Sequence, residues 1–488
     1  MRKESDFLGT LDIAEDALYG IHSVRASQNF PDNTRFHPEW YQAVGSVKRA
    51  CLATYRKYSD IVRTRYPGAD PPHPLISGSV IDALIEAAIE VEAGRHFNDF
   101  IVPAIQGGAG TSINMNVNEI ITNRALVISG FKPGDYQHID PVEHANVYQS
   151  TNDVVPTSLK ITLLRLLLKL ELSVNNLRAA FEDKEKITRD QLRMAFTQMQ
   201  EAVPSSYGRL FSTYNDALSR DWWRISKCSE RIKTVNLGGS AIGTGITVPR
   251  YFIREVVQVL QQHTGLPVTR AENLQDATCN LDSLVEIHGI LKAHAVNLEK
   301  IVSDIRLLSS DLIRRRELEI PQKQVGSSVM PGKVNPVIPE FVISSVHKIY
   351  SNDQLVSGLC GLGCLDLNAY IPTIGFALIE SIKLLMASDD CMKVHLVDGL
   401  QINSSVANEN LLNSPSITTA LLPYIGYNKA AMLAGEMKKM KINLLEANKL
   451  LGIMEESRIL RIIEPYHLLK EGFTLNDIVD DDRQRKGT

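Results

Sequence analysis

Clustered cysteine and histidine are what this sequence most clearly lacks. Its six cysteines form no Cys-x-x-Cys pair and have no companion histidine cluster. A zinc-type site requires such spacing. Cys360 and Cys364 lie four residues apart, so a metal or redox role is conceivable, but no other feature of the sequence supports it. The sequence therefore predicts reduced, inert thiols, no bound metal and no cofactor.

Long apolar runs and an excess of one charge are also missing. The leucine-rich stretch 161–174 contains Arg165, Lys169 and Glu171, and it is too short and too charged to span a bilayer. No apolar segment follows the first residues, so we expect a cytoplasmic protein without a secretory signal. The formal charge of −4 and the sequence pI near 6.3 offer no bulk attraction to nucleic acid or to an anionic membrane.

What is present is a long chain with helical periodicity. Its 488 residues exceed what one hydrophobic core usually supports, so we expect several subdomains or a core shared between subunits. Apolar residues recur every three to four positions from Leu291 to Leu312, and the leucines after Pro156 populate more than one helical face. We predict an all-α fold with a long central bundle, divided into 1–145, 146–402 and 403–488.

The most informative stretch is 326–336, read as Gly-Ser-Ser-Val-Met-Pro-Gly-Lys-Val-Asn-Pro. Glycine, serine, proline and asparagine are ordinary turn residues, so composition alone favours a surface loop. However, two hydroxyls, a lysine and an amide stand between glycines that give the backbone freedom to close over a ligand. Such a loop suits a base held against a carbanion.

Three further polar clusters lie far from this loop in the sequence. The stretch 106–119 combines glycines with Thr111 or Ser112 as expected caps of a following helix, and the stretch 144–153 precedes the leucine-rich helix. Uncharged polar residues at 197–204 interrupt a helical pattern. The glycine-rich stretch 238–245 lacks the ending of a phosphate loop and reads as a backbone turn.

The pattern Gly-Ser-Ser-x-Met-Pro-x-Lys-x-Asn-Pro resembles the motif of the aspartase/fumarase superfamily. The resemblance extends from Asp16–His22 to Pro423–Tyr427, and the wording at 106–112 is similar to that of aspartases. It implies three helical domains whose central helices associate into a homotetramer. It also implies active sites shared between subunits, and reversible elimination of ammonia from L-aspartate to give fumarate.

The resemblance also assigns a role to each matching residue. Ser327 is expected to be the general base that removes a proton beside the β-carboxylate, through an enediolate intermediate whose charge must be stabilised. A serine alkoxide near neutral pH requires its pKa to fall by roughly five units, or about 7 kcal/mol. The β-carboxylate is expected to contact Thr111, Ser150, Thr151 and Ser328. The α-carboxylate is expected to contact Thr197, Lys333 and Asn335. Asn152 and Gln198 are expected on the amino side, with Glu340 as a supporting partner behind these contacts.

Two alternatives remain open at this point. A class II fumarase acting on malate passes through the same kind of dianion, although Thr197-Gln198, Thr151-Asn152 and Gly110-Thr111 differ from the usual fumarase wording. A non-catalytic scaffold of the same fold is expected to have lost Ser327 or Lys333, and both are present. Phe196 replaces a usual arginine, and 140–143 departs from the pattern of an accessory carboxylate site in fumarases.

Overall fold

The structure is a computed structural model that describes residues 1–68, 75–313 and 316–478. The described residues form two compact units. Unit 1 comprises Met1–Glu171, Trp223–Ala293 and His347–Met386, and unit 2 comprises Leu172–Trp222, His294–Val346 and the described residues from Ala387 onwards. The division into three domains at 145 and 402 stays a prediction.

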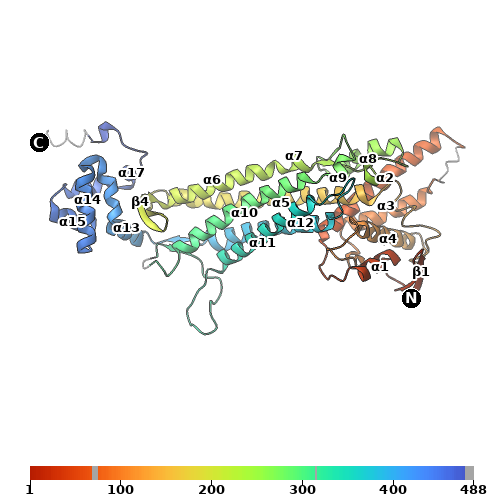
Figure 1. Ribbon diagram of the computed structural model, residues 1–488, viewed down its shortest axis with the longest axis horizontal. Coiled ribbons are helices and arrows are strands. Elements are labelled where there is room, and N and C mark those ends of the chain that lie inside the picture. Colours follow the sequence, from red (N-terminus) through yellow and green to blue (C-terminus); the bar gives the residue numbers. More distant parts are fainter. Residues whose placement is uncertain (69–74, 314–315, 479–488) are drawn as a thin grey trace. The chain divides into compact units, whose positions relative to one another are not determined.

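Helices dominate both units, as the periodicity predicted, and the fold is all-α. Five long helices contribute residues to both units (Figure 1): α5 (Thr151–Ile187), α6 (Tyr207–Ser226), α10 (Asp282–Leu308), α11 (Val337–Cys360) and α12 (Ile371–Met392). The helices of unit 1 alone are α1 (Ile21–Asn29), α2 (Pro38–Arg65), α3 (Gly78–Glu92), α4 (Thr111–Ile128), α7 (Cys228–Ile232), α8 (Arg250–Thr264) and α9 (Asp276–Cys279), with the short turn η1 (Phe97–Asp99) and η2 (Ala241–Gly243).

The helices found only in unit 2 belong to the last part of the chain. They are α13 (Ser404–Asn413), α14 (Leu422–Met440), α15 (Leu444–Leu451), α16 (Glu456–Ile462) and α17 (Pro465–Leu468), with the π-turn η3 (Lys393–Val397) and η4 (Pro415–Leu421). The β3 residues Leu192 and Met194 pack into the same buried apolar cluster as Leu411, Leu433 and Leu444. This small core fixes the base of the β3–β4 hairpin against the C-terminal helices.

Strands occur only as small pairs among the described residues. Three pairs are antiparallel, β1 (Arg2–Asp6) with β2 (Gly9–Ile13), β3 (Leu192–Thr197) with β4 (Gln200–Ser206), and β7 (Leu318–Glu319) with β8 (Gln401–Ile402); β5 (Thr234–Val235) and β6 (Thr269–Arg270) pair in parallel. The polar stretch 197–204 therefore belongs to a hairpin, because β3 and β4 pair directly across a two-residue turn.

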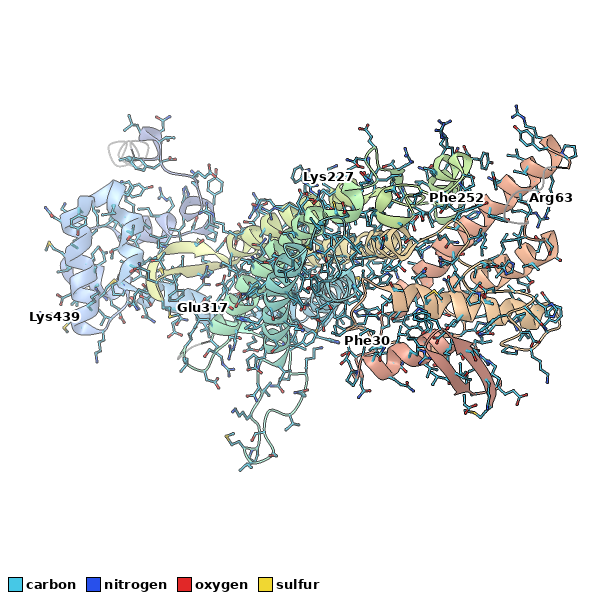
Figure 2. All side chains as sticks on the ribbon, turned by 45° about the vertical axis from the view of Figure 1, so that its right-hand side comes forward. Phe30, Arg63, Lys227, Phe252, Glu317 and Lys439 are labelled. Atoms are coloured by element: carbon cyan, nitrogen blue, oxygen red, sulfur yellow. The ribbon has the colours of Figure 1, made fainter. Side chains whose placement is uncertain are left out.

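Within unit 1, helix α2 packs against α3, α4 and α8. Phe252, labelled in Figure 2, is fully buried on α8 and lies edge-on to Tyr148 with ring centroids 5.8 Å apart. Tyr148 also contacts Tyr55 of α2, with centroids 5.6 Å apart. These aromatic contacts hold the chain just before Ser150 against two helices.

Within unit 2, buried charges tie the long helices together. His294 on α10 lies 3.0 Å from Asp221 of α6 and 3.0 Å from Asp389 of α12. Burial disfavours the charged imidazole, but the two carboxylates outweigh it and raise the pKa of His294 to about 10. Glu317, labelled in Figure 2, accepts hydrogen bonds from Tyr207 of α6 and Asn410 of α13, both at 2.8 Å.

One helical stretch among the described residues, Ile371–Val397, is long and apolar enough to cross a membrane by length and composition alone. Of its most apolar window, 61% is buried inside the structure. A core helix with this degree of burial passes the same test, so the stretch is weak support for a membrane span.

Candidate active site

The first predicted cluster lies at the start of α4, and its glycine rather than a hydroxyl caps the helix. Gly110 occupies the N-cap position with φ of 89°, and no side chain caps the helix. A Cβ atom at Gly110 would lie 2.8 Å from Cγ1 of Val155 on α5, so only glycine allows this close approach. The expected cap by Thr111 or Ser112 is therefore wrong. Thr111 is instead exposed in the first turn, where backbone N–H groups favour an anion.

The second cluster forms the start of α5. The Ser150 hydroxyl accepts the N–H of Asn152 at 3.2 Å, and Oδ1 of Asp153 accepts the N–H of Ser150 at 3.0 Å. This reciprocal capping uses the Ser150 oxygen as an acceptor and leaves its O–H to donate. The Thr151 hydroxyl has no hydrogen-bond partner within the described parts of the chain. Val155 lies on the same helix one turn after Thr151 and closely approaches Gly110, so unit 1 brings the backbone of the first two clusters together.

Pro156 changes the hydrogen bonding in the first turn of α5. It lies inside α5 and cannot donate an N–H to the carbonyl of Asn152 four residues earlier. That carbonyl instead accepts a hydrogen bond from Nδ2 of Asn236 at 2.9 Å. The proline thus frees an acceptor through which a distant residue anchors the first turn of α5.

The glycine-rich stretch 238–245 is the backbone turn that the sequence predicted, and it binds the same helical turn. Oδ2 of Asp153 accepts the N–H groups of Gly238 at 3.1 Å and Ser240 at 2.9 Å. Oδ1 of Asn152 accepts the N–H of Ile242 at 3.1 Å. Burial raises the pKa of the Asp153 carboxyl, while its hydrogen bonds from the N–H groups of Ser150, Ser240 and Gly238 act in the opposite direction. The turn therefore serves a protein carboxylate rather than a phosphate.

A buried lysine lies beneath this cluster and was missed by the sequence reasoning. Lys48 on α2 is fully buried, and its Nζ donates to Oδ1 of Asn146 at 3.0 Å and Oε1 of Gln149 at 2.9 Å. Burial lowers its pKa to about 7, although Cys51 and Asp153 raise it. A single lysine beside Arg49 in an apolar stretch gives no sequence signal for this position.

Replacing Lys48 by methionine is expected to remove a pH dependence of stability. Because the folded-state pKa of Lys48 lies below the ordinary 10.5, the unfolded chain binds a proton that the native chain has lost between these values. The free energy of unfolding should therefore rise by about 2 kcal/mol from pH 7 to pH 9 through this group. Urea unfolding of wild type and Lys48→Met at both pH values measures the difference. Equal pH slopes for the two proteins would contradict this origin.

The third cluster forms the tip of the β3–β4 hairpin. Thr197 pairs with Gln200, and the two residues between them, Gln198 and Met199, have φ of 52° and 61°. These values suit a type I′ turn, which asparagine and glycine adopt most readily. The hairpin therefore holds Thr197 and Gln198 exposed at a strained tip, and such strain is often found at functional sites.

Exchange of Met199 for glycine is expected to raise the free energy of unfolding by about 1 kcal/mol, because glycine accepts a positive φ without strain. Met199 is 78% exposed, so little packing is lost. The same exchange at exposed Met432, which lies inside α14, serves as the control and should lower stability by about 1 kcal/mol. Urea midpoints of the two variants measure both effects; a loss of stability in both would show that the turn is unstrained.

The fourth cluster is the predicted serine loop, which lies between α10 and α11 and projects from the helices of unit 2 (Figure 1). Its neck is closed by the N–H of Gly326, which donates to the carbonyl of Lys333 at 2.8 Å, and by Nδ2 of Asn335, which donates to the carbonyl of Gly326 at 2.7 Å. A Cβ atom at Gly326 would lie 2.5 Å from that Lys333 oxygen, and Gly332 has φ of 80°. Both glycines are thus required by the loop geometry.

The Ser327 hydroxyl oxygen accepts two hydrogen bonds from its own loop. The donors are the backbone N–H groups of Val329 at 3.1 Å and Met330 at 2.9 Å. Hydrogen bonds that favour the charged form of a group lower its pKa. Ser328 and Lys333 are exposed on the same loop. The loop itself therefore supplies two donors that a serine base requires.

Glu340 lies in the first turn of α11 and forms an ion pair with Arg306 of α10 at 3.7 Å. Both side chains are about half exposed, so the pair adds little stability. It joins the two helices that lead into and out of the serine loop. The supporting role expected of Glu340 stays a prediction.

The predicted site residues fall into two sets. Unit 1 holds Thr111, Ser150, Thr151 and Asn152, and unit 2 holds Thr197, Gln198, Ser327, Ser328, Lys333, Asn335 and Glu340. The six cysteines are unbridged, and no group of three or more histidine, cysteine, aspartate or glutamate side chains suited to a metal occurs within residues 1–68, 75–313 and 316–478. The predicted site residues of unit 1 carry hydroxyl and amide donors, and those of unit 2 add the ammonium of Lys333. Such donors suit a substrate with carboxylates.

Comparison with known proteins adds an independent line. The lyase family matches residues 9–350. The chain is 35% identical to the aspartate ammonia-lyase of Bacillus subtilis (strain 168), over 98% of each chain. It is 36% identical to that of Helicobacter pylori (strain ATCC 700392 / 26695), over 96% of this chain and 98% of the relative. The relative from Escherichia coli (strain K12) is 34% identical over 99% of each chain.

Solved structures show the same likeness. A cobalt-bound fumarate lyase:delta crystallin from Brucella melitensis has a TM-score of 0.89 and 34% identity, covering 96% of this chain and 100% of its own. The class II fumarase from Schistosoma mansoni has a TM-score of 0.83 and 27% identity, covering 95% of this chain and 98% of its own.

Proposed function

Because the chain belongs to the lyase family, in the aspartase/fumarase superfamily, we propose that it is an aspartate ammonia-lyase that converts L-aspartate reversibly to fumarate and ammonia. The main observation behind the proposal is that the Ser327 oxygen accepts hydrogen bonds from two backbone N–H groups within the superfamily motif. Aspartate ammonia-lyases similar over nearly the full chain support the choice of substrate.

In the proposed reaction, Ser327 acts as an alkoxide and takes the proton from the carbon next to the β-carboxylate. The electron pair of that C–H bond moves into the carboxylate, which becomes an enediolate with two negative charges. Thr111, Ser150, Thr151 and Ser328 would donate to it, and these hydrogen bonds strengthen as the charge develops. The exposed first turn at Thr111 and the free O–H of Ser150 suit this role.

The second step breaks the bond between carbon and nitrogen. The electron pair of the enediolate forms the carbon–carbon double bond, and the amino group, in its protonated ammonium form, leaves as ammonia with the bonding pair. Thr197, Lys333 and Asn335 would hold the α-carboxylate, while Asn152 and Gln198 would face the amino group. The Nδ2 of Asn335 closes the loop neck in this structure, so its contact with substrate would go with a rearrangement of the loop.

The proposal includes a homotetramer in the cytoplasm with active sites shared between subunits. The lyase family is oligomeric. Ser327, Ser328, Lys333, Thr197 and Gln198 are half-buried or exposed in a single chain, as expected of groups completed by neighbouring subunits. Co-expression of Ser327→Ala chains with Thr151→Val chains should restore activity that neither variant has alone, because mixed tetramers contain some intact sites. No recovery in mixed oligomers would contradict shared sites.

Ultraviolet absorbance of fumarate tests the function itself. Formation of fumarate from L-aspartate, with far slower turnover of L-malate, is the expected result. The likeness to a class II fumarase favours malate as the second candidate, and turnover of malate without aspartate would replace the proposal with a fumarase-type hydratase. Turnover of neither substrate by a folded oligomer would point to a non-catalytic scaffold.

A further inference from the structure

The side chain of Asn146 is the junction between the two helices that carry the unit 1 site residues. Its Oδ1 accepts three hydrogen bonds, from Nζ of Lys48 at 3.0 Å, Nδ2 of Asn114 at 3.0 Å and Nδ2 of Asn118 at 3.2 Å. Its Nδ2 donates to the carbonyl of Gln149 at 3.1 Å. One amide therefore touches α2, α4 and the residue directly before Ser150.

The hydrogen bonds of Lys48 determine how the amide side chains of this network are oriented. Nζ of Lys48 donates to both side chains, as an ammonium or as a neutral amine, so the oxygens of Asn146 and Gln149 face Lys48. Nδ2 of Asn114 and Nδ2 of Asn118 must then face the Asn146 oxygen. This orientation leaves Oδ1 of Asn114 and Oδ1 of Asn118 buried without a partner. The amide groups keep this one orientation although these two oxygens have no hydrogen-bond partner.

Such a cluster is a costly way to fill a core. A buried lysine loses its hydration, and each unpaired buried acceptor costs about 1–3 kcal/mol. Apolar side chains would serve a purely structural purpose at lower cost. The cluster lies close in sequence to both groups of proposed β-carboxylate donors, since Asn114 is one helical turn after Thr111 and Asn146 is four residues before Ser150.

We propose that Asn146, held by Lys48, is a positioning residue that sets the distance between Thr111 on α4 and Ser150 and Thr151 on α5. The proposal rests on the proposed function, in which these hydroxyls receive the enediolate charge. Movement of one helix start relative to the other would misplace donors in the transition state, and a displacement of about 1 Å can lower a rate about 100-fold. Asn146 itself does not touch the substrate in this role.

Asn146→Ala tests the proposal against a matched variant, Asn448→Ala. Asn448 on α15 is also buried, and its amide donates to and accepts from Met454 in unit 2. Both variants should lose a similar part of their stability in urea. Only Asn146→Ala should show kcat lower by roughly 30- to 100-fold with KM within about threefold, because the binding of the ground state needs less exact placement. Similar kcat values for the two variants would overturn the proposal.

Two measures keep the test decisive. If Asn146→Ala does not fold, Asn114→Ala takes its place, since it removes one of the two links from Asn146 to α4 and leaves the link to Lys48. It should lower kcat about tenfold; unchanged kcat would overturn the proposal. Each variant is compared with wild type on whichever of L-aspartate and L-malate the wild type turns over. Failure of the proposed substrate therefore appears in the wild type, whereas failure of the positioning role appears in the ratio.

Discussion

Replacing Ser327 by alanine is expected to lower kcat for L-aspartate by about 100- to 10,000-fold, the range for loss of a general base. The reason is geometric, because Oγ is the atom to which the N–H groups of Val329 and Met330 point. Without it, the loop still closes through the contact between Gly326 and Lys333, but no group in the loop can take the proton.

The measurement pairs steady-state kinetics with the exchange of the proton at carbon 3 for solvent deuterium. Both should be lost together in Ser327→Ala, while binding of succinate, an unreactive dicarboxylate, stays within about threefold because the positioning groups remain. Ser328→Ala is the matched variant; it should lower kcat by only about tenfold, since it removes one of several hydrogen bonds that strengthen as the enediolate forms. A Ser327→Ala enzyme with wild-type kcat would show that the base lies elsewhere.

The second large effect is expected from Lys333→Met, which should raise KM for L-aspartate by roughly 30- to 100-fold through loss of a charged hydrogen bond. Lys333 is exposed at the neck of the loop, where only its backbone carbonyl contacts Gly326, so its ammonium can reach a substrate carboxylate when the loop closes. Binding of succinate should weaken by the same factor, because the interaction is made in the ground state.

Lys323→Met provides the control, because it removes the same charge from an exposed position ten residues earlier. Its KM should stay within about twofold, as expected for a screened charge outside the site. A rise in KM shared by both variants would reduce the role of Lys333 to general electrostatic attraction.

The serine loop shows how much of the site the sequence contains. Local chemistry indicated that Gly326 and Gly332 would permit a tight loop, and both have a geometric reason in the structure. The two N–H groups at Ser327 come from residues two and three positions later, so they too depend only on local sequence. The features of the loop that depend only on a few neighbouring residues could therefore be predicted from the sequence.

The contacts that position the other half of the site depend on distant residues. Lys48 meets Asn146 and Gln149 across about 100 positions, and periodicity carries no information on such a pairing. The helix pattern around 197–204 likewise hid a hairpin, because the packing of Leu192 and Met194 against the C-terminal helices outweighs local propensity. The cap at α4 was wrong because close approach to Val155 requires Gly110.

The proline in α5 has a further consequence for the local opening of this helix. Because Pro156 removes one rung of the helix and Asn236 replaces it, the first turn of α5 is held by side chains from outside the helix. We expect that turn to open without unwinding of the rest of α5. The amides of Gly238, Ser240 and Ile242 bond to Asp153 and Asn152, so their hydrogen exchange reports that opening. Hydrogen exchange in this turn, which is remote in sequence, therefore reports whether the first turn of α5 is intact.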